Sequence, residues 1–321
     1  MISGGRPKLK QRPTAKFLHD LDIFGANVVW VVSEKDAPGY ELDDFPLSVY
    51  PQAWAREYAA AHWMLPTKPD QWSTTGGPDG FLGAFPGREW ACLEAERRGC
   101  WGVLQIDDNF TTLSIPRGTN SSRQVVKQHG GMGLFADLLA GVTLSTNGRM
   151  VGAALQSVNH ERPVVARKGF PYSLFVEQVG EGREPWFGPF EDDITHAYQY
   201  GTRSDGVTAG VATSLRYMKE SKSKSGMRAV YDQTRAVQLQ RIFPQSARIG
   251  IHASKSNGAG GPRVFHGMSS NAIRNPLRVT DPVLFGKVKA RLEGILAEWF
   301  IAQQEANRLK VSNRVKAGAR S

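Results

Sequence analysis

The amino-acid sequence predicts an α/β fold with a mixed, mainly parallel sheet flanked by helices. First, short β-branched runs alternate with helical patterns from residue 20 to residue 305. Second, a helical pattern over 87–99 leads through Gly99 into the hydrophobic run 101–106, and Asp107-Asp108-Asn109 follow directly. Third, residues 20–305 contain neither an internal repeat nor a low-complexity linker. One elaborated domain ending in a long helix is therefore the expected architecture.

The composition excludes two classes of protein. No apolar run approaches the length of a membrane span, and the N-terminus has no hydrophobic signal region. The two cysteines, Cys92 and Cys100, are too few for a disulfide framework. We therefore expect a globular protein of the cytoplasm without a membrane partner.

The positive charge is concentrated at the two ends of the chain. Residues 1–19 and 306–321 carry ten basic residues and no acid, which accounts for the whole net charge of +10. We expect a basic N-terminal arm (1–19), a neutral body (20–305) and a basic C-terminal tail (306–321). Such arms attract nucleic acid through counterion release, although solvated tails that only maintain solubility are the plainer alternative.

The first half of the chain supplies the opening elements. Residues 23–32 form a β-branched run of strand length, with Ser33, Glu34 and Asp36 in the loop behind it. Apolar residues at helical spacing predict a helix over 53–65. Residues 66–86 are rich in Gly, Pro and Thr, and we expect this long loop to border a site.

The second half alternates strands and helices before the last helix. Acidic residues 191–193 would occupy a first helical turn, where the helix dipole favours negative charge. Asp281-Pro282 would begin the final amphipathic helix. The expected strands are 151–158, 172–179, 207–218 and 247–251, and the expected helices are 133–146, 194–200 and 230–242.

Three clusters could carry chemistry, and each adjoins a predicted strand end or helix start. They are Asp107-Asp108-Asn109, Glu191-Asp192-Asp193, and His252 with the glycine-rich loop 254–261. Each has a plainer interpretation alone: a turn, a solvated helix start, or a structural histidine. The glycine-rich loop is not a P-loop, because Lys255 precedes its glycines.

Together the clusters supply what a metal-dependent transferase acting on a nucleotide-sugar needs. Oxygen ligands would hold a divalent cation that neutralises the diphosphate leaving group. A carboxylate would serve as the base for the acceptor hydroxyl. Arg88 or Lys255 would stabilise the departing diphosphate.

These motifs resemble those of GT-A glycosyltransferases. The strand ending in Asp107-Asp108-Asn109 is similar to their Asp-x-Asp motif, and Phe190-Glu191-Asp192 to their downstream Glu-Asp motif. His252 resembles their C-terminal metal-binding histidine. The runs Gln-Ile-Asp-Asp-Asn and Gly-Pro-Phe-Glu-Asp-Asp look most like the phage-type enzymes associated with TET/JBP dioxygenases, which include the glucosyltransferase that makes base J.

The resemblance implies a role for each candidate. The metal ligands for Mn²⁺ or Mg²⁺ would be Asp107, Asp108, Asn109 and His252. The donor, a UDP-sugar by this resemblance, would contact Ser33, Glu34, Asp36, Arg88, Asp107 and Lys255. Asp192 would be the catalytic base, with Glu191 as its competitor, provided that the reaction inverts the anomeric carbon. Asn109 departs from the common motif, since an amide ligates a cation without contributing charge.

The resulting hypothesis is a glycosyltransferase that modifies a 5-hydroxymethylpyrimidine in DNA, inside a bacterial or phage-infected cell. An extruded acceptor base could stack on Trp186, Phe187 and Phe190, although plain core packing explains these aromatics equally well. One rival is a nucleotidyltransferase, or a glycosyltransferase with a non-DNA acceptor. Another is a non-enzymatic nucleic-acid-binding protein whose acidic residues are structural.

Overall fold

The computed structural model describes most of the 321 residues. The described residues are 1–22, 28–64, 83–116, 125–127, 131–156, 163–189, 191–220, 237, 239–252 and 263–318. Side-chain positions are described for these residues except 20, 22, 125–127, 252, 263–266 and 311–318.

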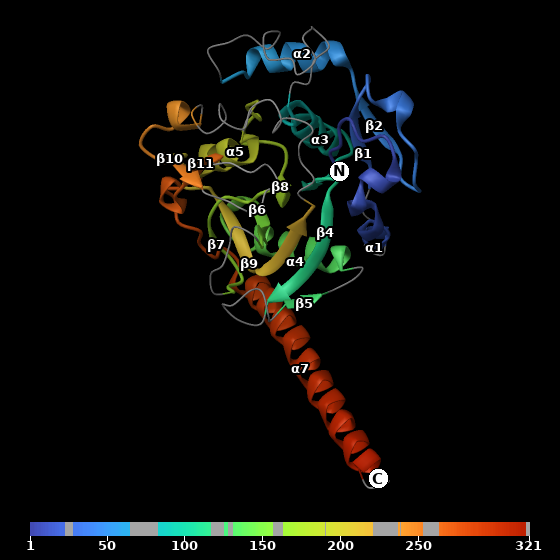
Figure 1. The fold of residues 1–321 in the computed structure, drawn as a ribbon. Helices are drawn as coiled ribbons and strands as arrows, with labels where there is room; N and C mark the ends of the chain where they lie inside the picture. Colours follow the sequence, from blue (N-terminus) through green and yellow to red (C-terminus); the bar gives the residue numbers. More distant parts are fainter. Residues whose placement is uncertain are drawn as a thin grey trace.

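A curled, mixed sheet of seven strands forms the centre of the protein (Figure 1). Its strands follow the order β3-β8-β6-β9-β4-β5, and β7 pairs with β9. The strands are β3 (Gly102–Ile106), β4 (Phe110–Pro116), β5 (Val125–Lys127), β6 (Gly148–Leu155), β7 (Arg167–Lys168), β8 (Leu174–Gln178) and β9 (Thr208–Lys219).

The prediction of a mainly parallel sheet is wrong. Within the described part of this sheet only β6 and β9 run parallel, and the other pairs are antiparallel. The physical reason lies in the connections. Three residues, 107–109, lead from β3 to β4 without the helix that a crossover to a parallel neighbour needs. β3 and β4 do not pair with each other, and each lies antiparallel to another strand, β8 and β9 respectively.

The N-terminal segment is packed into the body. Ile2 forms parallel bridges to both Val31 and Asp107, and so connects β1 (Trp30–Ser33) to β3. β1 in turn pairs in parallel with β2 (Leu47–Tyr50). Phe17 and Leu18 are buried in the main core, beside the short helix α1 (His19–Asp22). Residues 1–19 therefore do not extend as the basic arm that we expected.

Helices cover both faces of the sheet. The neighbours Leu174 and Phe175 of β8 belong to different hydrophobic clusters, because successive side chains of a strand point to opposite faces. The first cluster lies against α4 (Met132–Leu144), and the second against α3 (Phe85–Arg97) and α5 (Asp192–Gly201). Helix α2 (Gln52–Ala61) packs on α3, where Trp54 and Trp90 are 4.9 Å apart between ring centroids.

The final helix, α7 (Pro282–Gly318), begins on the body and projects away from it (Figure 1). Val288 and Leu292 are buried in the cluster against α4, whereas Phe300, Ile301 and Leu309 are exposed. Its 37 residues correspond to about 55 Å of helix. Beside the sheet, β10 (Ala247–His252) and β11 (Arg263–Met268) form an antiparallel pair.

Many element predictions are confirmed. The expected helix at 87–99 is α3, and Gly99 follows it with a φ of +70° that favours glycine. The expected elements at 101–106, 133–146, 172–179, 207–218 and 247–251 correspond to β3, α4, β8, β9 and β10. The loop at 66–86 and the helix at 230–242 lie largely outside the described residues. Among the described residues, no helix is both long and apolar enough to cross a membrane.

Candidate active site

The candidate site lies where β3 ends, at a turn anchored by the N-terminal segment. Thr14 Oγ1 donates to the carbonyl of Asp107 at 2.7 Å and accepts from the Phe110 amide at 2.8 Å. The Asp107 amide donates to the carbonyl of Ser173 at 3.0 Å. These bonds fix the backbone on both sides of Asp107 and determine where its carboxylate points.

Asp107 lies between two cations. Its Oδ1 accepts from Arg88 Nη2 at 3.1 Å, and its Oδ2 accepts from Lys219 Nζ at 2.6 Å. Burial raises the pKa of the Asp107 carboxyl, but the charges of Lys219 and Arg88 outweigh that effect and hold the pKa well below its usual range. Asp107 is therefore an anion at neutral pH. It keeps 23% of its side chain exposed and Lys219 keeps 25%, so a ligand can reach both groups.

Arg88 connects this strand end to helix α5. Arg88 Nε donates to Asp192 Oδ2 at 2.7 Å while its Nη2 binds Asp107. The guanidinium is only 4% exposed, and it lies 5.3 Å from the ring centroid of Trp186. A buried arginine between two carboxylates is well paired, and the aromatic ring restricts its orientation.

Asp193 adds a third carboxylate to the same group. Burial and the neighbouring charge of Asp192 raise its pKa to about 7, in spite of the opposing charges of Arg88 and Lys219. A carboxyl group that titrates near neutral pH can both accept and donate a proton. Glu191 has a φ of +50° and is the N-cap residue, directly before the first residue of α5, Asp192.

The other two members of the Asp107-Asp108-Asn109 motif reach different partners. Asp108 accepts from Ser3 Oγ at 2.6 Å and also pairs with Arg6. The side-chain Nδ2 of Asn109 donates to the backbone carbonyl of Glu220 at 3.3 Å. As placed, the three side chains do not share one site that a divalent cation could occupy. Among the described residues, no group of three or more His, Cys, Asp and Glu side chains is arranged to hold a metal.

The residues predicted to contact the nucleoside, Ser33, Glu34 and Asp36, lie in the part of the protein around Asp108. Ser33 Oγ and Asp36 Oδ2 are 3.0 Å apart, and Glu34 accepts from the Gln52 amide at 3.1 Å. Tyr40, which follows this loop, donates to Ser3 Oγ at 2.7 Å, and Ser3 in turn donates to Asp108. Lys255, Phe190 and the side chain of His252 lie outside the described residues, so the proposed ligand His252 and the phosphate contact Lys255 stay predictions.

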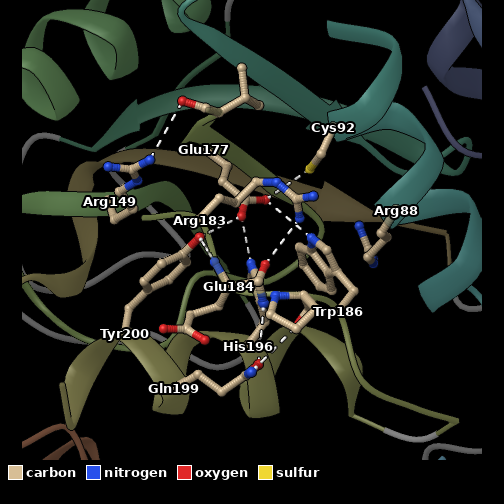
Figure 2. Close-up of polar contacts among 12 residues, drawn as sticks. Arg88, Cys92, Arg149, Glu177, Arg183, Glu184, Trp186, His196, Gln199 and Tyr200 are labelled. Carbon is tan, nitrogen blue, oxygen red and sulfur yellow. Dashed lines mark hydrogen bonds and ion pairs between the residues drawn. The ribbon is translucent and has the colours of Figure 1, made fainter. Parts of the chain in front are cut away.

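Sequence reasoning missed a buried polar network behind the site. Figure 2 shows the Glu177 carboxylate surrounded by donors from several elements. His196 Nε2 lies 2.6 Å from its Oε1, Tyr200 donates to Oε1 at 2.8 Å, and Trp186 Nε1 donates to Oε2 at 3.2 Å. Glu177 and His196 are fully buried. Since Trp186 also lies against Arg88, this network holds the ring that orients the arginine.

Lys219 was also missed, although it completes the cation pair around Asp107. It follows Asp107 by 112 residues at the end of β9, and no local motif marks it. A lysine at the end of a strand does not by itself indicate a functional site. Its position beside Asp107 follows only from the pairing of β9 with β4.

Comparison with known proteins identifies no relative. No protein family, no curated protein and no solved structure matches this chain.

Proposed function

We propose that this protein is a glycosyltransferase that moves a sugar from a nucleotide-sugar to a hydroxyl acceptor, with the reaction centred on Arg88, Asp107, Asp192, Asp193 and Lys219. The observation that carries the proposal is the bridge by Arg88 between Asp107 at the end of β3 and Asp192 at the start of α5. This bridge brings together the two acidic motifs on which the GT-A resemblance depends, although 84 residues separate them in the sequence.

The cations supply the affinity for a diphosphate. Arg88 and Lys219 approach the same carboxylate from two sides, and Lys219 is partly exposed. A diphosphate arriving at this point would exchange part of its hydration for these two charges. As the bond between the anomeric carbon and the diphosphate oxygen breaks, Lys219 and Arg88 would stabilise the negative charge that develops on the leaving group.

The acidic residues of α5 supply the base. In an inverting reaction the acceptor hydroxyl oxygen attacks the anomeric carbon, and its proton passes to a carboxylate. Asp192 is the predicted base, and Asp193 joins it as the alternative because a carboxyl with a pKa of about 7 is a stronger proton acceptor than an ordinary one. The main role of Glu191 would be to start the helix. The requirement for Mn²⁺ or Mg²⁺ stays a prediction.

We expect the acceptor to be a 5-hydroxymethylpyrimidine in DNA, with contact to the polyanion made mainly by α7. Arg308 and Lys310 are exposed on the projecting half of that helix (Figure 1). Arg12 is buried over Trp30 and Arg6 pairs with Asp108, so part of the N-terminal charge is used within the fold. The cationic side chains along this helix would release counterions from the DNA, and this release would favour binding.

Donor turnover tests the proposal and separates it from its rivals. Release of nucleoside diphosphate from a panel of nucleotide-sugars is measured with and without DNA, for the wild type, Asp192→Asn, Asp193→Asn and the control Asp205→Asn. Asp205 also pairs with an arginine, Arg203, but outside the proposed centre. We expect turnover in the wild type and the control, and a loss of at least about 100-fold in one of the two α5 variants. Absence of turnover for every donor, or equal turnover in all variants, would exclude the proposed centre.

The products separate the remaining alternatives. Release of diphosphate from a nucleoside triphosphate, with the nucleotide joined to an acceptor, would identify a nucleotidyltransferase. Donor turnover that responds to small-molecule acceptors but not to any DNA would exclude the DNA acceptor and leave the glycosyltransferase proposal in place.

A further inference from the structure

Ser173, directly before β8, has an unfavourable backbone conformation. Among the described residues other than glycine, only Ser173 and Glu191 have a positive φ, and that of Ser173 is +55°. Across it, the Leu174 amide donates to the carbonyl of Tyr172 at 2.5 Å, which is the hydrogen bond of a γ-turn. A γ-turn with a positive φ at its centre is the rare and strained form, because the Cβ atom lies too close to the following carbonyl oxygen. Serine therefore costs backbone energy here that glycine would avoid.

The structure around this turn holds the strained conformation in place. Tyr217, which is fully buried in β9, donates its hydroxyl to the same Tyr172 carbonyl. On the other side, the Ser173 carbonyl accepts from the Asp107 amide at 3.0 Å, which continues the pairing of β8 with β3. Strained residues persist where the surrounding contacts determine them, and they cluster at functional sites. Ser173 is such a residue, directly opposite the carboxylate on which the proposed centre depends.

The side chain of Ser173 contacts a cation of the proposed centre. Its Oγ accepts a hydrogen bond from Lys219 Nζ, which also donates to Asp107 Oδ2 at 2.6 Å. Ser173 is 3% exposed, whereas the Lys219 side chain is 25% exposed. A lysine carries a point charge on a flexible stem, so a second acceptor restricts where its ammonium group lies. Ser173 supplies this second acceptor, while Lys219 stays accessible to a ligand.

We propose that Ser173 is a positioning residue, whose hydroxyl holds the Lys219 ammonium group beside Asp107, where it would bind a diphosphate. The inference rests on the proposed function, because it assigns a role at the same centre. A purely structural role leads to the opposite expectation. Glycine would relieve the strain of the turn, so the backbone alone favours glycine at position 173, and only the contact with Lys219 favours serine.

Thermal unfolding of two variants tests whether serine is strained at this position. Ser173→Ala removes the hydroxyl and keeps the Cβ atom, whereas Ser173→Gly removes both. We expect the Tm of Ser173→Gly to lie at least about 1 °C above that of Ser173→Ala, because only glycine relieves the strain. A Tm of Ser173→Gly equal to or below that of Ser173→Ala would overturn the proposal, since the backbone would then not favour glycine.

The contact with Lys219 is tested without any assumption about function. The folded protein is acylated briefly with acetic anhydride, and peptide mapping measures the modification of each lysine. In Ser173→Gly we expect Lys219 to react at least about threefold faster than in the wild type, because its amine has lost one acceptor and its side chain is less restricted. Lys168, whose Nζ donates to the carbonyl of Ile273 at 2.9 Å, is the internal control and should not change. Unchanged reactivity of Lys219 would overturn the proposal.

Inorganic pyrophosphate tests whether the position of Lys219 matters for a diphosphate. Its Kd is measured by calorimetry for the wild type, Ser173→Gly, Lys219→Met and the double variant. Since Ser173 acts through Lys219, Ser173→Gly should weaken binding at least about threefold when Lys219 is present, and less than about 1.5-fold in the Lys219→Met background. Equal weakening in the two backgrounds would overturn the positioning role, because the effect of Ser173 would then not pass through Lys219.

The same variants separate a failure of this inference from a failure of the proposed function. With a nucleotide-sugar as substrate, we expect Ser173→Gly to lower kcat more than it raises KM, because the Lys219 charge would act mainly on the departing diphosphate. Turnover with unchanged kcat and KM in Ser173→Gly would leave the proposed function in place and overturn the role of Ser173. Faster acylation of Lys219 in Ser173→Gly, with no pyrophosphate binding by the wild type, would overturn the diphosphate site and with it the proposed function.

Discussion

Arg88 donates from Nη2 to Asp107 Oδ1 at 3.1 Å, so the helix that leads into β3 is bonded to the carboxylate that ends this strand. The same guanidinium donates from Nε to Asp192 at 2.7 Å. One buried side chain thus sets the separation between the strand end and the first turn of α5. The proposed chemistry depends on this separation. The leaving group would lie beside Asp107, and the acceptor hydroxyl would lie beside Asp192.

Replacing Arg88 should cost both stability and activity. Arg88→Ala leaves Asp107 and Asp192 without their shared partner, and breaking a buried ion pair costs about 3–5 kcal/mol. Arg97→Ala, in the same helix but 71% exposed, should change the free energy of unfolding by less than about 1 kcal/mol. Urea unfolding of the two variants checks the difference. Similar losses of unfolding free energy in the two variants would show that the Arg88 bridge contributes little to stability.

Asp193 should make stability depend on pH in a defined direction. Its folded pKa of about 7 lies above the unfolded value of about 3.9, so the folded state binds the proton more tightly. The stabilisation is complete below pH 4 and is lost as the pH rises to 7, with a slope of up to about 1.4 kcal/mol per pH unit. Asp193→Asn should remove this slope. Thermal unfolding of both proteins from pH 4 to 8 measures it, and parallel curves would contradict the assignment.

The two cysteines should differ in reactivity. Burial and the nearby charge of Glu177 raise the pKa of the Cys92 thiol, whereas Cys100 is partly exposed. In the native protein a thiol reagent should modify Cys100 at least about tenfold faster, and Cys100→Ser should leave almost no fast-reacting thiol. Peptide mapping after a short exposure identifies the site. Fast modification of Cys92 would mean that the network around Glu177 opens readily.

The outer part of α7 should contribute to binding of DNA. Replacing Arg308 and Lys310 with Glu removes two exposed cations, which should reduce the salt slope of DNA affinity by about 2. Lys287 and Lys289, exposed near the start of the same helix, provide a control with the same charge change. Fluorescence anisotropy at several salt concentrations compares the two pairs. A larger effect at 287 and 289 would place the DNA contact on the body instead.

The sequence allowed the order of most elements to be predicted, but not the direction of the strands. The pattern from α3 through Gly99 to β3 is local and was recognised, because helix period, glycine and hydrophobic run all agree. No element was predicted for Phe110–Pro116, the residues of β4, in which Thr, Ser and Pro weaken the strand pattern. Because no strand was predicted there, the antiparallel pairing of this segment with β9 was not foreseen.

The candidate site shows a similar limit. Arg88, Asp107 and Asp192 stand near recognisable motifs, and their mutual contacts join groups that the sequence analysis had singled out separately. Lys219, Glu177 and His196 stand in no motif, because their positions depend on strand pairing and on the packing of α5. The basic N-terminal segment was misjudged for another reason: composition reports charge, but Arg6 and Arg12 find partners only in the folded chain.

The most direct test of the account is the mass of a DNA oligonucleotide carrying 5-hydroxymethylpyrimidine after incubation with the protein and a panel of nucleotide-sugars. We expect the oligonucleotide to gain the mass of one sugar per modified base with the wild type, and no gain with Asp107→Asn or with an unmodified oligonucleotide. A gain that persists in Asp107→Asn would contradict the central role of the residue between Arg88 and Lys219. No gain with any donor would contradict sugar transfer to DNA.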